Sequence, residues 1–200
     1  VFATPPCQGM STANYKKADD EQIRNSLVVQ AIKLVSQIQP KIFIFENVRA
    51  FMKTICTDTD GNDKPISESI YSNLADRYNI FHRVINFKDY GVPSSRPRTI
   101  VIGTSKEFLN LSPLSLFPSR HKEIKLREAI GDLAPLDYGQ RDKEDILHFA
   151  RQFPIEQLEW IKNTKEGQSS FDQPLEFQPG HYDKHGNKVV NKGAYMGNKY

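Results

Sequence analysis

The feature that most constrains the fold is a short run of β-forming residues at 41–45, Lys-Ile-Phe-Ile-Phe, directly after Pro40. A run without polar alternation is typical of a parallel strand that is covered on both faces. Before it, at 23–38, apolar residues recur at three- and four-residue steps, as in an amphipathic helix. A helix followed by such a strand predicts an α/β domain, with Glu46 and Asn47 at the carboxyl end of the strand, where open α/β sheets bind ligands.

The alternation of helix and strand continues downstream. Ile70, Leu74 and Tyr78 lie four residues apart and predict a second helix, which follows a polar loop at 57–65. Two further strands and the end of a third are predicted, at 80–87, at 99–103 and in the opening residues 1–6. The chain is therefore expected to begin within a domain.

A shift of composition to Pro, Ser and Leu at 110–120 predicts a domain boundary. We assign residues 1–119 to the α/β domain and 120–200 to a second, incomplete and less regular domain with helices at 124–133 and 143–163. The segment from Phe177 to Tyr200 contains four lysines and one aspartate. Its net charge of +3 equals the net charge of the whole chain. This local charge suits nucleic acid, and it is equally typical of a solvated charged loop.

Composition excludes several classes of protein. No uninterrupted apolar run approaches the roughly 18 residues that cross a bilayer, so we expect no membrane association. The two cysteines, Cys7 and Cys56, make no disulfide framework and are too few for a structural zinc site. We expect no metal and a reducing, cytosolic compartment.

The cysteines differ in their sequence context. Cys7 follows Pro5 and Pro6 and precedes Gln8-Gly9, in a turn with a restricted backbone just after a predicted strand. This predicts a rigid, accessible thiol, whose reactivity depends on basic or dipolar surroundings. For Cys56 we predict a small buried hydrophobic residue.

The other candidate catalytic or binding residues are Glu46 and two arginines. After an apolar strand the Glu46 carboxyl is expected to be partly desolvated and is a candidate acid, although a capping or salt-bridged carboxylate is the more common role for such a residue. Arg96 and Arg98 have alternate spacing, so in an extended segment they point the same way and suit phosphate or carbonyl recognition. An ordinary surface pair of arginines fits the same spacing.

The order of these motifs resembles the DNA cytosine C5-methyltransferases. Four segments carry the resemblance: Pro5 to Ser11, which is similar to the Pro-Cys-Gln loop; Arg24 to Leu27, a helix start; Glu46-Asn47-Val48; and Asn86 to Gly103 with Arg96-Pro97-Arg98, which is similar to the Gln-x-Arg-x-Arg motif. Ser94 stands where the family usually has Gln, and Pro97 separates the arginines. The motifs cover about the first half of the chain.

The resemblance implies a catalytic role for four residues. Cys7 would attack C6 of cytosine, making C5 nucleophilic toward the methyl group of S-adenosylmethionine. Glu46 would contact N3 and the exocyclic amine, and Arg98 would hold O2 with support from Arg96. The resemblance also implies contacts to the flipped base and its strand from Pro5, Gln8, Ser11, Arg24 and Asn47.

The implied fold is part of a Rossmann-like S-adenosylmethionine-dependent methyltransferase domain, followed by the start of a smaller, irregular target-recognition domain. Weak cofactor contacts fall on Pro6 and Leu27. The family's Gly-rich cofactor loop would precede Val1, and its last helical motif would follow Tyr200. Residues 1–119 would be the later part of the catalytic domain, without that loop.

The leading hypothesis is a monomeric enzyme of a restriction-modification system that methylates duplex DNA in a bacterial or phage-like setting, in the cytoplasm at the nucleoid. A tRNA cytosine C5-methyltransferase and a catalytically inactive DNA-binding or regulatory relative are the alternatives.

Overall fold

The computed structural model describes residues 1–6 and 26–190 and divides into two compact units, 1–131 and 132–200. Four residues singled out in the sequence, Cys7, Gln8, Ser11 and Arg24, lie outside the described residues. The domain boundary proposed at 119/120 falls within the first unit and stays a prediction.

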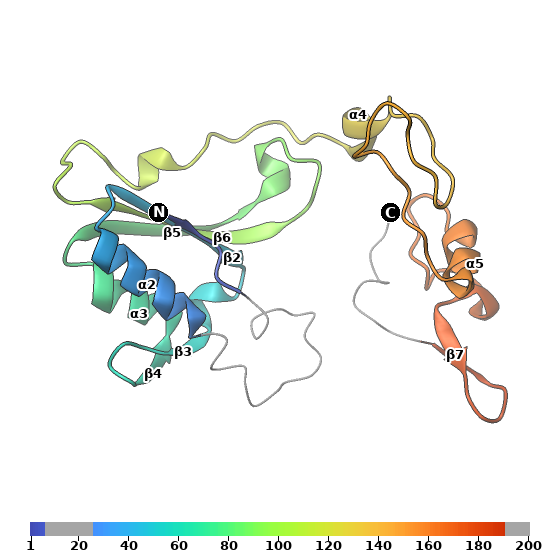
Figure 1. Ribbon diagram of the computed structural model, residues 1–200, viewed down its shortest axis with the longest axis horizontal. Coiled ribbons are helices and arrows are strands. Elements are labelled where there is room, and N and C mark those ends of the chain that lie inside the picture. The colour runs from blue at the N-terminus through green and yellow to red at the C-terminus, as the bar shows by residue number, and fades with distance from the viewer. Residues whose placement is uncertain (7–25, 191–200) are drawn as a thin grey trace. The chain divides into compact units, whose positions relative to one another are not determined.

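Unit 1 contains most of the regular structure (Figure 1). Its strands are β1 (Phe2–Ala3), β2 (Ile42–Val48), β3 (Ile55–Thr57), β4 (Asp63–Pro65), β5 (Tyr78–Asn86) and β6 (Pro97–Ser105). Its helices are α2 (Leu27–Ile38), α3 (Ile66–Leu74) and α4 (Leu126–Ile130), with the 3-10 turns η1 (Phe51–Lys53), η2 (Phe87–Tyr90) and η3 (Leu114–Leu116).

The main sheet of unit 1 has the strand order β1-β2-β6-β5. β1 runs parallel to β2, whereas β2 pairs antiparallel with β6, and β6 pairs antiparallel with β5. The expectation of a parallel strand is thus correct on one side of β2 only. β6 returns from β5 through a turn, and a strand that returns in this way runs antiparallel to its neighbour.

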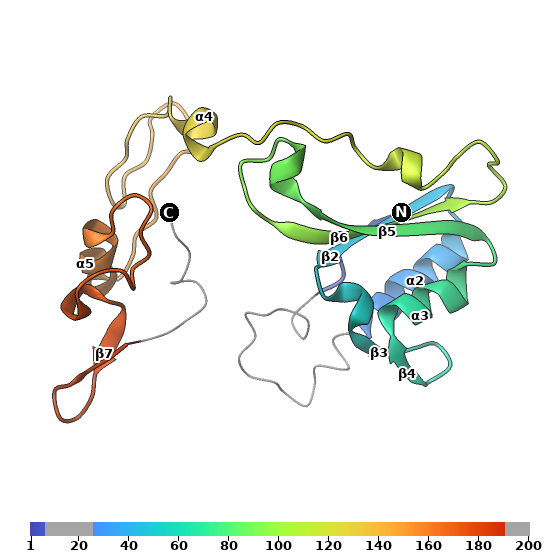
Figure 2. The same ribbon diagram turned by 180° about the vertical axis from the view of Figure 1, so that it is seen from behind.

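The two faces of this sheet are covered unequally. α2 and α3 lie on the same face (Figures 1 and 2), and alternate residues of β2, Phe43, Phe45 and Asn47, are buried there. The intervening residues of β2 are half-buried. The prediction that this strand is covered on both faces is therefore wrong for the described residues, because both described helices that pack on the sheet use one face.

Aromatic packing fixes the centre of the core. The rings of Phe43 and Tyr78 meet edge to face with their centroids 5.1 Å apart, and the Tyr78 hydroxyl donates to the Pro40 carbonyl oxygen at 2.9 Å. Gly103 lies opposite Phe43 in the β2–β6 register. A Cβ at Gly103 would come within 1.9 Å of the Phe43 ring, so this position of β6 needs glycine.

Helix and strand limits differ modestly from the sequence-based ones. α3 spans Ile66–Leu74 and ends before Tyr78, which begins β5. Tyr78 continues the helical spacing of Ile70 and Leu74, yet it pairs with Ser105 in the β5–β6 register and so belongs to the sheet. The predicted loop at 57–65 also contains structure, because it joins β3 to β4 in a small hairpin.

Unit 2 has little regular structure: α5 (Ile155–Asn163), η4 (Leu175–Phe177), and a hairpin of β7 (Gly180–Tyr182) and β8 (Lys188–Val190). The predicted helix at 143–163 is wrong before residue 155, since α5 begins after Pro154. The Asp142 carboxylate instead accepts from the backbone N–H groups of Glu144 and Asp145, and such local bonds compete with a helix. The predicted helix at 124–133 is confirmed in part, as α4.

The described residues contain neither a candidate membrane span nor a candidate metal site. Among residues 1–6 and 26–190, no helix has both the length and the apolar character of a membrane span. Within the same ranges, no group of three or more His, Cys, Asp or Glu side chains is arranged to hold a metal ion.

Candidate active site

The centre of the candidate site is an ion pair between adjacent strands. Arg98 lies opposite Val48, and Glu46 lies two residues back along β2 on the same face of the sheet. Nε of Arg98 lies 3.0 Å from Oε1 of Glu46, and their side chains are 15% and 22% exposed. The end of β2 and the start of β6 meet because the strands are antiparallel, which brings together two residues 52 positions apart.

Asn47 joins β2 to the segment that leads to Cys7. Its side chain is buried on the opposite face from Glu46, and Nδ2 donates to the Pro5 carbonyl oxygen at 2.8 Å. Oδ1 accepts from the backbone N–H of Val48 at 2.8 Å. The Asn47 side chain thus hydrogen-bonds to both Pro5 and Val48, and it holds Pro5 beside the end of β2. Because a carbonyl oxygen has two lone pairs, Pro5 retains acceptor capacity for a ligand amine.

Arg96 differs in position from Arg98. β6 begins at Pro97, so Arg96 precedes the strand, and its side chain is exposed. The Asn86 side chain holds this segment: Oδ1 accepts from Arg96 N at 2.9 Å, and Nδ2 donates to Ser95 Oγ at 3.1 Å. Asn86 thereby closes the 87–96 loop at its base. The sequence-based reasoning missed Asn86, although a polar residue at a strand end before turn residues is a signal for such a bond.

The remaining predicted contacts are only partly placed. Pro6 is exposed at the end of the first described segment, and Leu27 is 45% exposed as the first residue of α2. Cys7, Gln8, Ser11 and Arg24 lie outside the described residues. Among the described residues, the site therefore consists of Glu46, Arg98, Asn47 and the Pro5 carbonyl.

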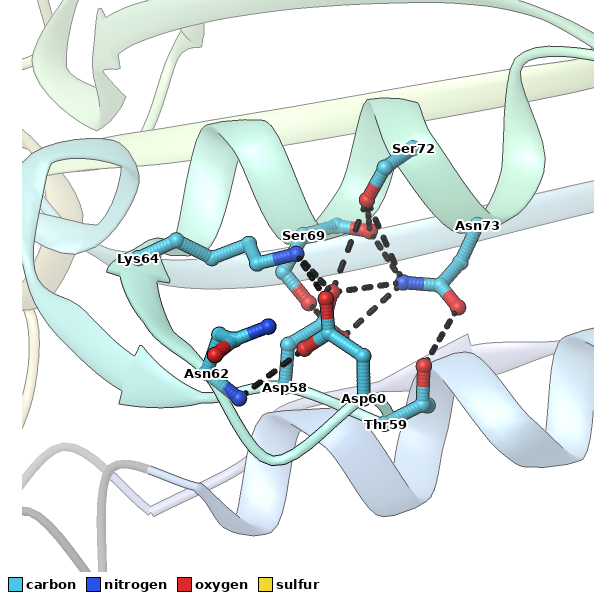
Figure 3. Close-up of polar contacts among 8 residues, drawn as sticks. All are labelled: Asp58, Thr59, Asp60, Asn62, Lys64, Ser69, Ser72 and Asn73. Carbon is cyan, nitrogen blue, oxygen red and sulfur yellow. Dashed lines mark hydrogen bonds and ion pairs between the residues drawn. The ribbon is translucent and has the colours of Figure 1, made fainter.

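A second polar cluster, which the sequence analysis treated as loop, lies where the β3–β4 hairpin packs on α3 (Figure 3). Asp58 is only 6% exposed, and its carboxylate accepts from Ser69 Oγ at 2.6 Å and from Asn73 Nδ2 at 2.9 and 3.1 Å. Lys64 Nζ lies 3.1 Å from Asp58 and 2.9 Å from Asp60. The Asp-Gly pair at 60–61 was the available signal for a turn at this hairpin.

The electrostatics of Asp58 are those of a structural carboxylate. Burial by itself would raise its pKa, but hydrogen bonds from Ser69, the Thr59 backbone and Lys64, together with the charge of Lys64, lower the pKa overall. Cys56, beside this cluster, is fully buried, as predicted, and burial raises the pKa of its thiol. Neither residue has the exposure that a reacting group needs.

Comparison with known proteins identifies the family. The model of the C-5 cytosine-specific DNA methylases matches residues 1–198. The chain is 28% identical over 200 residues to the Type II methyltransferase M1.HgaI of Avibacterium volantium, covering 98% of this chain and 52% of that protein. The chain belongs to the C-5 cytosine-specific DNA methylases.

Other members of the family match over shorter stretches. Identity to the Type II methyltransferase M.BspRI of Lysinibacillus sphaericus is 34% over 139 residues, covering 67% of this chain and 31% of that protein. A crystal structure described as a prophage-encoded DNA modification methyltransferase of E. coli aligns with a TM-score of 0.53 and 25% identity, over 72% of this chain and 37% of that one. The chain spans about a third to a half of the length of these relatives.

Membership in the C-5 cytosine-specific DNA methylases relates the Glu46–Arg98 ion pair to a class of reaction. The fold is that of a Rossmann-like methyltransferase domain, as predicted, and methyltransferases of this kind take the methyl group from S-adenosylmethionine. A carboxylate beside a guanidinium presents acceptors and donors next to each other. Such a surface can bind a polar edge that offers both hydrogen-bond donors and acceptors.

Proposed function

We propose that the complete protein containing this chain is a DNA (cytosine-5-)-methyltransferase and the modification partner of a restriction system. One observation carries the proposal: Glu46 and Arg98 pair at 3.0 Å on neighbouring strand ends. The Pro5 carbonyl is tied to the same strand end through Asn47. Family membership adds the reaction class. An enzyme that acts on bacterial or phage DNA would work in the cytoplasm at the nucleoid.

In the proposed mechanism, Cys7 adds to C6 of a flipped cytosine. The new S–C6 bond moves the C5=C6 electron pair toward C4 and N3, and a proton shared between the Glu46 carboxyl group and N3, together with the Arg98 guanidinium at O2, would stabilise the charge that develops. C5, now nucleophilic, would take the methyl group as the bond from that group to the sulfonium sulfur of the donor breaks, and the sulfur would keep the electron pair. Loss of the C5 proton then restores the double bond and releases the Cys7 thiolate. The base must leave the helix because stacking covers C6 inside a duplex.

S-adenosylmethionine, when bound, would supply the methyl group. Among the described residues, Pro6 and Leu27 would contribute apolar contact, since both are exposed and their side chains carry no polar group. Apolar contact fits the uncharged parts of the cofactor. We therefore assign no step of the reaction to Pro6 or Leu27.

Duplex DNA is the proposed partner, and unit 2 is the proposed start of the target-recognition region. Two observations support this role. The β7–β8 hairpin carries Lys184 and His185 in an exposed turn, and a two-stranded ribbon fits the major groove. The Asp183 carboxylate accepts hydrogen bonds from the backbone N–H groups of His185 and Asn187, and these bonds lower its pKa. The acidic side chain of the turn therefore also stabilises the turn.

The test compares substrates. The complete protein is incubated with S-adenosylmethionine labelled in the methyl group and with either duplex DNA or tRNA. We expect label in 5-methylcytosine of DNA. Label in tRNA alone would establish the tRNA methyltransferase instead, and label in neither would support the inactive, DNA-binding relative.

A trapping experiment tests the nucleophile separately. Duplex DNA with 5-fluorocytosine at the target position should form a covalent adduct, because fluorine at C5 cannot leave as a proton does. The Cys7→Ser protein should form no adduct and transfer no methyl group. An adduct that persists in Cys7→Ala would remove Cys7 from the mechanism.

A further inference from the structure

Thr99 makes a side-chain hydrogen bond to the backbone on the core face of the sheet, directly behind the candidate site. It is fully buried in β6, on the core face of the sheet, opposite Asn47 in the β2–β6 register. Its hydroxyl donates to the Val48 carbonyl oxygen at 3.1 Å and approaches the Arg49 carbonyl oxygen at 3.4 Å. The hydroxyl therefore satisfies backbone acceptors where β2 ends.

Thr99 and Asn47 together connect three chain segments. Asn47 joins the end of β2 to Pro5, and Thr99 joins the same end of β2 to the start of β6. Glu46 and Arg98 are the sequence neighbours of these two residues and project from the other face of the sheet. A shift of the β2 end relative to β6 would thus change the 3.0 Å separation of Glu46 and Arg98.

We propose that Thr99 is a positioning residue for the methyl-transfer reaction, acting through the end of β2 on Glu46 and through its own strand on Arg98. The proposal rests on the proposed function and adds to it a residue that touches neither the base nor the cofactor. Its contribution is geometric: a buried hydroxyl holds two charged groups at the separation at which they contact one base. Misplacement of catalytic groups by about 1 Å can reduce a rate by about a hundredfold.

Thr104 provides a matched control in the same strand. It is also fully buried, and its hydroxyl also donates to a backbone carbonyl oxygen, that of Leu111 at 2.9 Å. It lies five residues, or about 17 Å of strand, from Thr99. Thr→Val removes the same atom at both positions with little change of shape. A general loss of stability should therefore be similar in the two variants, and only Thr99→Val should disturb the site.

The first measurement is steady-state methylation of duplex DNA by the complete protein. We expect Thr99→Val to lower kcat by about tenfold to a hundredfold, while KM for DNA changes by less than about twofold. Thr104→Val should keep the kcat of the unmodified protein within about twofold, and Thr99→Ser, which restores the hydroxyl, should recover most of the lost activity. Equal kcat values for Thr99→Val and Thr104→Val would overturn the proposal.

The second measurement does not depend on activity. Amide hydrogen exchange of residues 44–50 reports directly on the end of β2. Thr99→Val should accelerate exchange in this segment by about tenfold more than Thr104→Val does. Unchanged exchange would overturn the positioning role even if activity fell. An inactive unmodified protein would instead refute the proposed function, while the exchange result would still decide for or against Thr99.

Discussion

Unit 1 contains two clusters built around a carboxylate, and they use it in opposite ways. Asp58 is 6% exposed and is surrounded by donors from Ser69, Asn73 and Lys64. The Glu46 side chain is 22% exposed and, within the described part of the chain, is paired with Arg98. An ionised carboxylate has about four acceptor positions. Asp58 has most of its positions occupied, whereas Glu46 keeps capacity for a ligand.

The difference shows how to separate a structural carboxylate from a functional one. Glu46 lies near the end of β2 and Asp58 directly follows β3, and both have a cationic neighbour within 3.1 Å. The Asp58 donors come from the hairpin and α3 and hold these elements together. Glu46 faces away from the helices, at the edge where Pro5 and Arg98 also lie. The number of occupied acceptor positions and the face of the sheet therefore distinguish the two, and proximity to a cation does not.

The largest expected effect comes from neutralising the functional carboxylate. Glu46→Gln keeps the size of the side chain and should lower kcat for DNA methylation by about a hundredfold to a thousandfold, the usual loss when one transition-state contact is removed. The partly exposed ion pair contributes little to folding, so the thermal midpoint should change by only a few degrees. A large fall in this midpoint without a loss of kcat would show that Glu46 is structural, like Asp58.

Much of this site could be predicted from the sequence. The motif around Glu46 and the pair Arg96/Arg98 is local in sequence. Strand patterns placed it next to predicted strands at 41–45 and 99–103, which the structure has at 42–48 and 97–105. The pairing itself was not predictable from pattern, because it depends on an antiparallel register between residues 52 positions apart. The role of Thr99 was not predictable for the same reason. In a sequence pattern a threonine within a strand is not distinct from other β-forming residues, and the acceptor of its hydroxyl group lies on the partner strand.

Other elements show where local pattern fails. The segment 143–154 has helical spacing, yet the Asp142 side chain binds nearby N–H groups and turns the chain instead. Tyr78 continues the spacing of α3 but belongs to β5, where it pairs with Ser105 of β6. The Asp58 cluster lies in a segment predicted as a polar loop, and its Ser69 and Asn73 donors come from the helix that follows the hairpin. In the latter two cases contacts outside the local sequence window decide the structure.

The second prediction concerns the structural cluster. Asp58→Asn should destabilise the protein by about 3 kcal/mol, because it leaves Lys64 without its buried partner and turns an amide toward the Ser69 and Asn73 donors. Chemical denaturation measures the change. Asp60→Asn is the control, as Asp60 contacts the same Lys64 nitrogen from a side chain that is 47% exposed, and its effect should be far smaller. Similar losses in both variants would contradict the distinction between buried and exposed partners.

Acid titration sharpens the same comparison. The pKa of Asp58 is lowered in the folded protein, so its ionised form stabilises the fold fully above the unfolded-state pKa of about 4. As pH falls through that value toward the folded pKa, the contribution is lost. The stability difference between the unmodified protein and Asp58→Asn should therefore be constant from about pH 5 to 7 and shrink below about pH 4. A difference that grows on acidification would contradict the lowered pKa.

The smallest expected effect is at Cys56, which borders the Asp58 cluster. Its thiol is fully buried, and burial together with the nearby Asp58 charge raises its pKa against the opposing effects of Ser69 and Lys64. Cys56→Ala should cost about 1 kcal/mol of stability and leave kcat unchanged, and a thiol reagent at neutral pH should modify Cys56 only after unfolding. Mass spectrometry of labelled peptides measures this. Loss of kcat in Cys56→Ala without loss of stability would mean that the structural cluster also acts on the strand ends, so that the two clusters could no longer be treated as independent.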